Sequence, residues 1–190
     1  EEPVVMTSDK ETPAAGDWNT VSFAKGSTAV LTHLRFECFN GILSQSMDIE
    51  LRDVEIDQVN GAGIRFYHNQ TDPWVRPLVI NLTVTNCSSY PVEAPSTLGH
   101  LPIMEGLNLE NNREEVIYLG NSISGDYTPD GVEVYVNNTG YPYKAGGMVQ
   151  YNNYHTTIAP GTVFQLTNRM KIRRGLFTAI GTESQPIQIV

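Results

Sequence analysis

The sequence predicts an all-β protein, a right-handed parallel β-helix (solenoid) of about eight coils with little or no α-helix. Three observations lead to this fold class. The 190 residues include 16 glycines and 11 prolines, which mark many short turns, and β-branched and aromatic residues dominate between them. No long stretch places apolar residues at helical spacing. A phrase of two apolar residues one apart, then a polar tail and a turn, recurs along the chain.

The recurring phrase defines the coils. Its five copies start at the following apolar residues: Leu34, Val54, Leu82, Leu107 and, more loosely, Val134. Successive copies start 20 to 28 residues apart, which is typical of a solenoid whose loops vary in length. Each copy alternates apolar and polar residues, as a strand with one buried face does. Since a single strand cannot pair with itself, each is expected to pair with the same strand of the next coil.

The alignment of the coils predicts two further features. Asn86, Asn111 and Asn138 fall in one column, where stacked asparagines in the left-handed region would hold the turns; the alternative is exposed turn asparagines without a ladder. Cys38 and Cys87 lie two coils apart, a separation of roughly 10 Å. Because a disulfide needs Cα atoms within about 7 Å, two buried free thiols are expected.

The two ends of the chain carry similar segments, since an acidic residue, a proline and a β-prone run occur at Pro3 and again at Pro186. These prolines are 183 positions apart, so residues 1–190 are interpreted as one β-helix unit, a single period with overlapping ends. No cap is recognised over either end, and uncapped ends expose backbone groups that pair with another edge. The predicted assembly-interface residues are Pro3, Val4, Met6, Pro186, Ile187 and Ile189.

Head-to-tail contacts of this kind build an open filament when the rotation does not close. Eight coils at ~4.8 Å each give a subunit rise of roughly 38 Å. A fragment of a longer covalent repeat array explains the same ends, and the sequence does not separate the two interpretations.

Two segments resemble bacterial cell-surface β-helix regions of the pectin-lyase-like superfamily. The first matches the opening of those regions at Pro3, Val4, Thr7, Ser8, Gly16, Asp17, Trp18, Val21, Phe23, Gly26 and Ser27. The second matches the segment that precedes that opening, at Ile158, Pro160, Gly161, Thr162, Phe164, Gly175, Ala179, Gly181, Thr182, Pro186 and Ile187. The resemblance covers about a third of the chain and implies an extracellular or cell-surface β-helix whose junction is divided between the two termini.

The net charge and the lack of long apolar runs exclude some classes of partner. A net charge of −9 argues against nucleic acid and against anionic membrane surfaces. The chain contains no run of 18 apolar residues, so no membrane insertion is predicted. It also contains no charged segment followed by an apolar stretch, so no signal peptide is predicted.

No set of residues predicts catalysis or a bound metal. The nearest counterparts of a polysaccharide-hydrolase site are Thr128 to Gly131, Gly99-His100 and Lys171 to Gly175, and the adjacent aspartate pair is absent. No catalytic residue, metal ligand or cofactor is therefore assigned. Calcium is the weak alternative, through Asp126 and Asp130 or through the outward acidic column formed by Glu37, Asp57 and Glu110. The histidines His33, His68, His100 and His155 are expected at the surface or in turns.

Tyrosines cluster between residues 141 and 154 and are candidate contacts for surface glycans or for another filament; they are Tyr141, Tyr143, Tyr151 and Tyr154. Packing over a broad sheet is the alternative. The functional prediction is an extracellular structural or adhesive building block that stacks on copies of itself, head to tail, and is not an enzyme. The alternative is a carbohydrate-binding or polysaccharide-degrading module of a larger surface protein.

Overall fold

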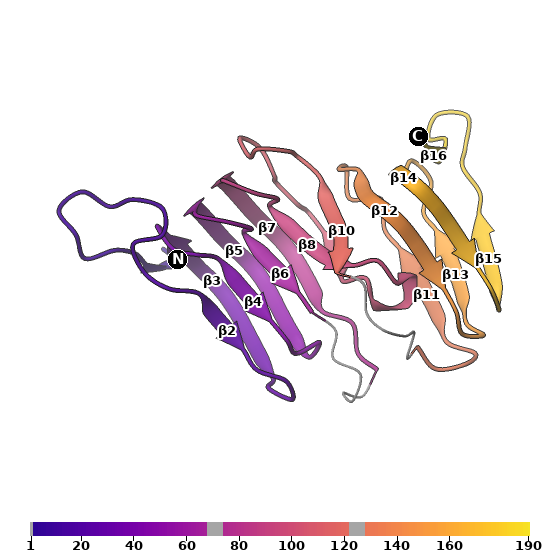
Figure 1. Cartoon of the computed structure of the whole chain (residues 1–190), viewed down its shortest axis with the longest axis horizontal. Helices are drawn as coiled ribbons and strands as arrows, with labels where there is room; N and C mark the ends of the chain where they lie inside the picture. The colour runs from indigo at the N-terminus through magenta and orange to yellow at the C-terminus, as the bar shows by residue number, and fades with distance from the viewer. Residues whose placement is uncertain (1, 68–73, 122–127) are drawn as a thin grey trace.

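The computed structural model is an all-β parallel solenoid of about seven turns (Figure 1). It describes residues 2–67, 74–121 and 128–190. The only helical turn in those ranges is a 3-10 segment, η1 (Leu98–His100). The predicted fold class is therefore confirmed, with a number of turns close to the eight expected.

The strands alternate between sheets along the chain, and every pairing between them is parallel. A five-stranded sheet holds β1 (Val4–Met6), β3 (Ala29–Glu37), β5 (Ile49–Val59), β7 (Leu78–Cys87) and β9 (Ile103–Glu105). An eight-stranded sheet holds the even-numbered strands β2 (Val21–Phe23), β4 (Ile42–Ser44), β6 (Ile64–Phe66), β8 (Val92–Pro95), β10 (Ile117–Asn121), β12 (Tyr143–Gln150), β14 (Val163–Ile172) and β16 (Gln188–Ile189). A three-stranded sheet holds β11 (Glu133–Val136), β13 (His155–Ile158) and β15 (Leu176–Ala179).

The predicted register holds through the first coils. Leu34 pairs with Val54, and Val54 pairs with Leu82, as the recurring phrase requires. An isolated bridge between Thr83 and Asn108 brings the fourth copy into the same alignment. The inward positions of β5 and β7 are fully buried, and each such aliphatic side chain contributes about 1.5–3 kcal/mol.

The fifth copy departs from that register. Val134 lies on β11, which pairs with β13 in the three-stranded sheet and not with β9. Val134 and Val136 are nonetheless buried, so the alternating pattern predicted their burial correctly and their neighbour wrongly. Periodicity reports which face of a strand is inward, but it does not report which strand lies beside it.

The turn column is confirmed for Asn86 and Asn111 and is wrong for Asn138. Asn86 has φ 55° and Asn111 has φ 60°, and the Asn86 N–H donates to the Asn111 carbonyl at 3.2 Å. Cys38 and Gln58 occupy the same position of the two preceding coils, with φ 60° and 53°. Asn138 instead donates its side-chain amide to the Pro160 carbonyl. The coils that contain β3, β5, β7 and β9 thus each bend at a left-handed residue at or after the end of the strand.

The inward column of the eight-stranded sheet runs through all eight strands without a shift at this position. Its rungs are Val21, Ile42, Ile64, Val92, Ile117, Tyr143, Phe164 and Ile189. The middle rungs are fully buried, whereas Ile189 at the end of the column is 59% exposed.

Arg76 connects the five-stranded sheet to the three-stranded sheet. Its Nε donates to the Leu101 carbonyl at 2.6 Å, and its Nη2 donates to the Tyr135 carbonyl on β11 at 2.9 Å. Burial disfavours the guanidinium charge and lowers the pKa of Arg76 to about 10. The two sheets meet where the recurring phrase loses its register.

Both cysteines are buried free thiols, as predicted. Cys38 is 2% exposed and Cys87 is 5% exposed. Burial raises the pKa of both thiols, that of Cys87 to about 12. They act as small apolar side chains of the core.

Candidate functional site

The two ends of the solenoid present open strand edges. Among the described strands, β1 pairs only with β3 and β2 only with β4 at one end, while β15 pairs only with β13 and β16 only with β14 at the other. An unpaired edge offers a row of N–H and C=O groups to another strand. The ends are therefore the candidate functional site.

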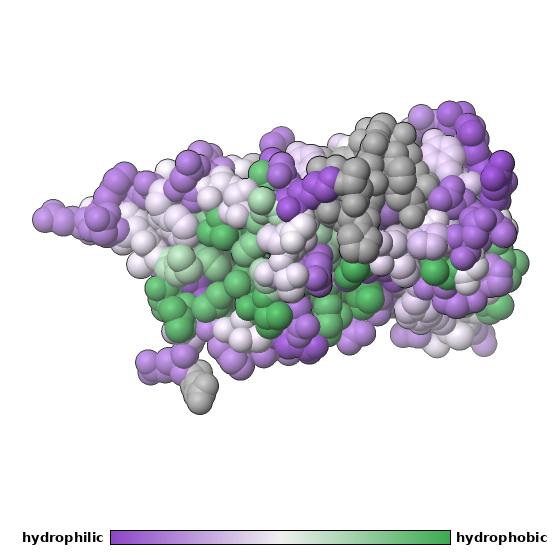
Figure 2. Space-filling model, turned by 90° about the horizontal axis from the view of Figure 1, so that it is seen from below, coloured by the Kyte–Doolittle hydropathy of each residue, from purple (hydrophilic) through white to green (hydrophobic). Residues whose placement is uncertain are grey.

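The predicted interface residues divide evenly between these two ends. At the N-terminal end, Pro3 is exposed, Val4 is 64% exposed and Met6 is 44% exposed. At the C-terminal end, Pro186 is exposed and Ile189 is 59% exposed. The remaining predicted residue, Ile187, is partly buried against the core. Figure 2 shows hydrophobic residues gathered on the N-terminal half of the face that it displays.

The two end strands do not occupy equivalent positions. β1 belongs to the five-stranded sheet, whereas β16 belongs to the eight-stranded sheet, in which β2 is the strand at the other end. The sequence similarity around Pro3 and Pro186 therefore does not superpose the two segments in the coil. In a continued solenoid β16 would lie beside a β2 strand, and β15 beside a β1 strand.

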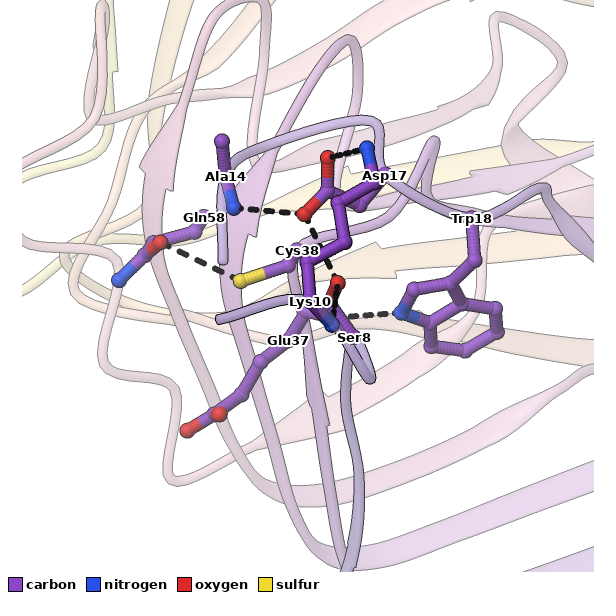
Figure 3. Close-up of polar contacts among 8 residues, drawn as sticks. All are labelled: Ser8, Lys10, Ala14, Asp17, Trp18, Glu37, Cys38 and Gln58. Atoms are coloured by element: carbon purple, nitrogen blue, oxygen red, sulfur yellow. Dashed lines mark hydrogen bonds and ion pairs between the residues drawn. The ribbon is translucent and has the colours of Figure 1, made fainter. Parts of the chain in front are cut away.

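A loop between β1 and β2 is organised by Asp17 (Figure 3). The carboxylate accepts hydrogen bonds from the Ser8 hydroxyl at 2.8 Å and from the Ala14 N–H at 2.8 Å, and it pairs with Lys10 Nζ at 2.6 Å. The Lys10 contact, followed by the Ala14 and Ser8 hydrogen bonds, lowers the pKa of Asp17 to about 2. Asp17 is thus an anion that holds both limbs of the loop together.

Trp18 covers part of the N-terminal end of the core. Its indole stacks on Phe39 with ring centroids 4.9 Å apart, and Phe39 stacks in turn on Phe36. The indole Nε1 donates to the Glu37 carbonyl at 2.7 Å. The expectation that neither end has a cap is therefore wrong in part. The cover could not be recognised in the sequence, because neither a helix nor a polar repeat marks this loop as a cap.

An open groove lies between that loop and β1. Its volume is about 430 Å³, and its lining is Val5, Met6, Thr7, Ser8, Asp9 and Trp18. The lining thus combines the apolar side chains of Val5, Met6 and Trp18 with the carboxylate of Asp9. Apolar side chains of a neighbouring coil fit such a groove.

The C-terminal end is apolar and basic. Its most exposed large apolar residues are Leu176, Ile180, Ile189 and Val190. Nearby, the second half of β14 and the turn after it carry the cations Arg169, Lys171, Arg173 and Arg174. Arg173 lies over the Tyr151 ring, 4.8 Å from its centroid. The sequence prediction did not include these cations, although a count of charges by segment reveals them.

The predicted tyrosine strip is not an exposed surface. Tyr143 is 1% exposed and Tyr154 is fully buried, so neither is available to a glycan. The hydroxyl of Tyr141 accepts a hydrogen bond from the Leu109 N–H, and Tyr151 is the ring beneath Arg173. The alternative of packing over the sheet describes Tyr143, on β12, and Tyr154, just before β13, because both side chains belong to the buried core.

The outward acidic column is partly neutralised. Asp57 lies beside Glu37 and accepts hydrogen bonds from the Thr85 hydroxyl and the Asn86 amide, both at 2.7 Å. Arg35 contacts Glu37 at 2.5 Å and Asp57 at 3.9 Å. No group of three or more His, Cys, Asp or Glu side chains is placed for a metal ion within the described ranges. Asp126, half of the alternative calcium loop, lies outside them.

Two residues of the fragments that resemble a hydrolase site lie in the core. Thr128 packs against Gly99, but Thr128 and the adjoining His100 are completely buried. The Asp130 carboxylate accepts a hydrogen bond from the Asn153 N–H. His100 ends the 3-10 turn η1, so it is a turn histidine as expected, but it is buried in the core. His33 and His155 lie exposed beside Asp53 and Glu133, and His68 is outside the described residues.

No family model, curated protein or solved structure matches the chain. In the ranges that the structure describes, no helix has the length and hydropathy needed to cross a membrane. The geometry of the ends therefore carries the functional argument.

Proposed function

We propose that the chain is a structural β-solenoid module of an extracellular or cell-surface protein, and that further copies of it continue the solenoid from end to end. The copies are separate subunits or successive repeats of a longer polypeptide. The observation that carries this proposal is the pair of open, parallel strand edges with exposed apolar side chains at opposite ends. Edges of this kind are ordinarily shielded in a protein that remains a monomer.

The surface location rests on the resemblance of residues 3–36 and 157–190 to cell-surface β-helix regions of the pectin-lyase-like superfamily. We favour a structural role, with no enzymatic activity and no cofactor, over catalysis. The reason is that His100 and Thr128, two residues of the segments that resemble a hydrolase site, are buried. The buried Tyr143 and Tyr154 weaken the case for a glycan-binding module.

Negative-stain electron microscopy and sedimentation velocity of the purified 190-residue chain test the proposal. About seven turns at ~4.8 Å each predict fibres with an axial repeat of roughly 34 Å. A protein that remains monomeric at high concentration and binds polysaccharide would contradict the proposal and favour the carbohydrate-binding alternative.

Variants that introduce one lysine at either end of the solenoid test the role of the open edges. Val4→Lys and Ile189→Lys each place an ammonium group in an apolar end and are expected to shorten or abolish the fibres. Tyr135→Lys is the control, because Tyr135 is 49% exposed on β11, away from both ends. Fibres that tolerate both edge variants would contradict a role for the ends.

A further inference from the structure

The two ends of the solenoid carry opposite charge. Residues 2–17 contain four carboxylates, Glu2, Asp9, Glu11 and Asp17, against the single cation Lys10. Residues 155–190 contain four cations, Arg169, Lys171, Arg173 and Arg174, and only one carboxylate, Glu183. The overall charge of −9 conceals this asymmetry, which runs along the solenoid axis because the chain advances one coil at a time.

The charges stand beside the open edges. β16 pairs with Val163 and Phe164, and the Leu166 N–H donates to the Val190 carbonyl, so the second half of β14, with Arg169 and Lys171, extends past the end of this pairing. Arg174 is exposed in the turn that follows. At the other end, the loop between β1 and β2 projects past the first coil (Figure 1), and Asp9 and Glu11 are exposed on it.

The inward column indicates the register of a continued sheet. Val21 is its first rung and Ile189 its last, and the rungs between them pair without a shift. A parallel strand added beyond β16 in the same register places its inward residue opposite Ile189. β2 is the strand of a second copy that has the matching position and a free edge.

Resting on the proposed end-to-end assembly, we propose its polarity and register. The basic C-terminal coil of one copy docks on the acidic N-terminal coil of the next, with β16 beside β2 and β15 beside β1. Ile189 then faces Val21 of the next copy. The groove lined by Val5, Met6 and Trp18 receives apolar side chains of the C-terminal coil, and Asp9 and Glu11 approach the cations of β14 and its following turn.

Opposite charge favours this polarity over the others. Two N-terminal ends facing each other would place acidic loops together, and two C-terminal ends would oppose the arginines. Parallel strand pairing also favours head-to-tail association. Two like ends related by a two-fold axis would bring their strands together antiparallel.

Cysteine cross-linking tests the register. Val21→Cys and Ile189→Cys, prepared as separate proteins and mixed under mild oxidation, are expected to form a disulfide-linked pair, while each alone forms none. The paired Cα atoms would lie about 5 Å apart, within reach of a disulfide. Val30→Cys mixed with Ile189→Cys is the control, because Val30 is 62% exposed at the same end but lies on β3 of the other sheet.

Charge reversal tests the polarity. Asp9→Lys/Glu11→Lys and Arg169→Glu/Arg174→Glu are each expected to weaken association by on the order of tenfold or more at low salt, and the two variants mixed together are expected to restore it. Association of the unaltered protein is expected to weaken as the salt concentration rises. Reversal without effect, or without rescue in the mixture, would overturn the charge-guided polarity.

The outcomes separate the two proposals. A protein that does not associate under any of these conditions overturns the proposed function together with the register. Fibres in which Ile189→Cys links to Val30→Cys and not to Val21→Cys overturn the register and leave end-to-end assembly standing. Linkage of Val21→Cys to itself identifies association through like ends and overturns the polarity.

Discussion

Trp18 and Glu37 are joined by a hydrogen bond between the indole Nε1 and the main-chain carbonyl, at 2.7 Å, across the first and second coils. The same indole stacks on Phe39, so one side chain contributes both a polar and an apolar contact to the end of the core. The N-terminal loop is consequently part of the folded solenoid as well as a wall of the proposed docking groove.

Truncation of Trp18 is expected to destabilise the fold. Trp18→Ala removes the stacking and the hydrogen bond, and a loss of about 2–4 kcal/mol in the free energy of unfolding is expected. Trp18→Phe keeps an aromatic ring on Phe39 and loses the N–H donor, so a smaller loss of about 1 kcal/mol is expected. Urea unfolding of the three proteins measures the difference. Equal losses for both variants would show that stacking contributes little.

Asp17 makes the stability of this loop depend on pH. The pKa of Asp17 is lowered to about 2 in the folded protein from an ordinary 3.8, so the stabilisation is complete above about pH 4 and is lost as the pH falls towards 2. Asp17→Asn has no charge to lose. The difference in unfolding free energy between the two proteins is therefore expected to shrink between pH 4 and pH 2.

A difference that stays constant over that range would show that the carboxylate charge does not contribute. Ser8→Ala is a second variant for this test, because it removes the hydrogen bond that the Ser8 hydroxyl donates to the Asp17 carboxylate and leaves the Lys10 ion pair in place. It is expected to reduce the pH dependence without abolishing it.

Asn111 tests the left-handed column. Its φ of 60° disfavours any residue with a Cβ except Asn and Asp, so Asn111→Ala is expected to cost about 1–2 kcal/mol. Asn111→Gly removes the steric conflict and is expected to remain within about 1 kcal/mol of the unaltered protein. Thermal unfolding monitored by circular dichroism distinguishes them. An alanine variant as stable as the glycine variant would contradict the strained geometry.

The two thiols are expected to be unreactive in the folded protein. Burial raises the pKa of Cys87 to about 12 and also raises that of Cys38, so little thiolate exists at pH 8. A maleimide is expected to label neither residue until denaturant is added, and both afterwards. Mass spectrometry without reductant is expected to find no link between them. Rapid labelling of the native protein would contradict the burial of that thiol.

Local pattern was sufficient to predict the first half of the fold. Leu34, Val54 and Leu82 were placed in one column because apolar and polar residues alternate there with a period of two and each copy ends in a polar turn. Val134 has the same alternation and belongs to a different sheet, and Arg76 contacts the Leu101 and Tyr135 carbonyls where the two sheets meet.

The candidate site was predicted less completely. Val4, Met6 and Ile189 were recognised because apolar residues in a short edge strand have nothing of their own chain to cover them. The cover provided by Trp18 and the burial of Tyr143 were missed, because both depend on neighbours one or more coils away.

Side-chain alternation and spacing are local properties, and they were enough to establish a parallel solenoid, two free cysteines and apolar ends. The sheet to which a strand belongs is decided only when the coils are assembled. β1 and β16 have similar sequences but lie in different sheets, because the position of a strand within its coil depends on the path of all the turns before it. The same coiling places Asp9 and Glu11 beside one end of the solenoid and Arg169 and Arg174 beside the other. The composition contains those charges, but their separation along an axis exists only once the chain has coiled.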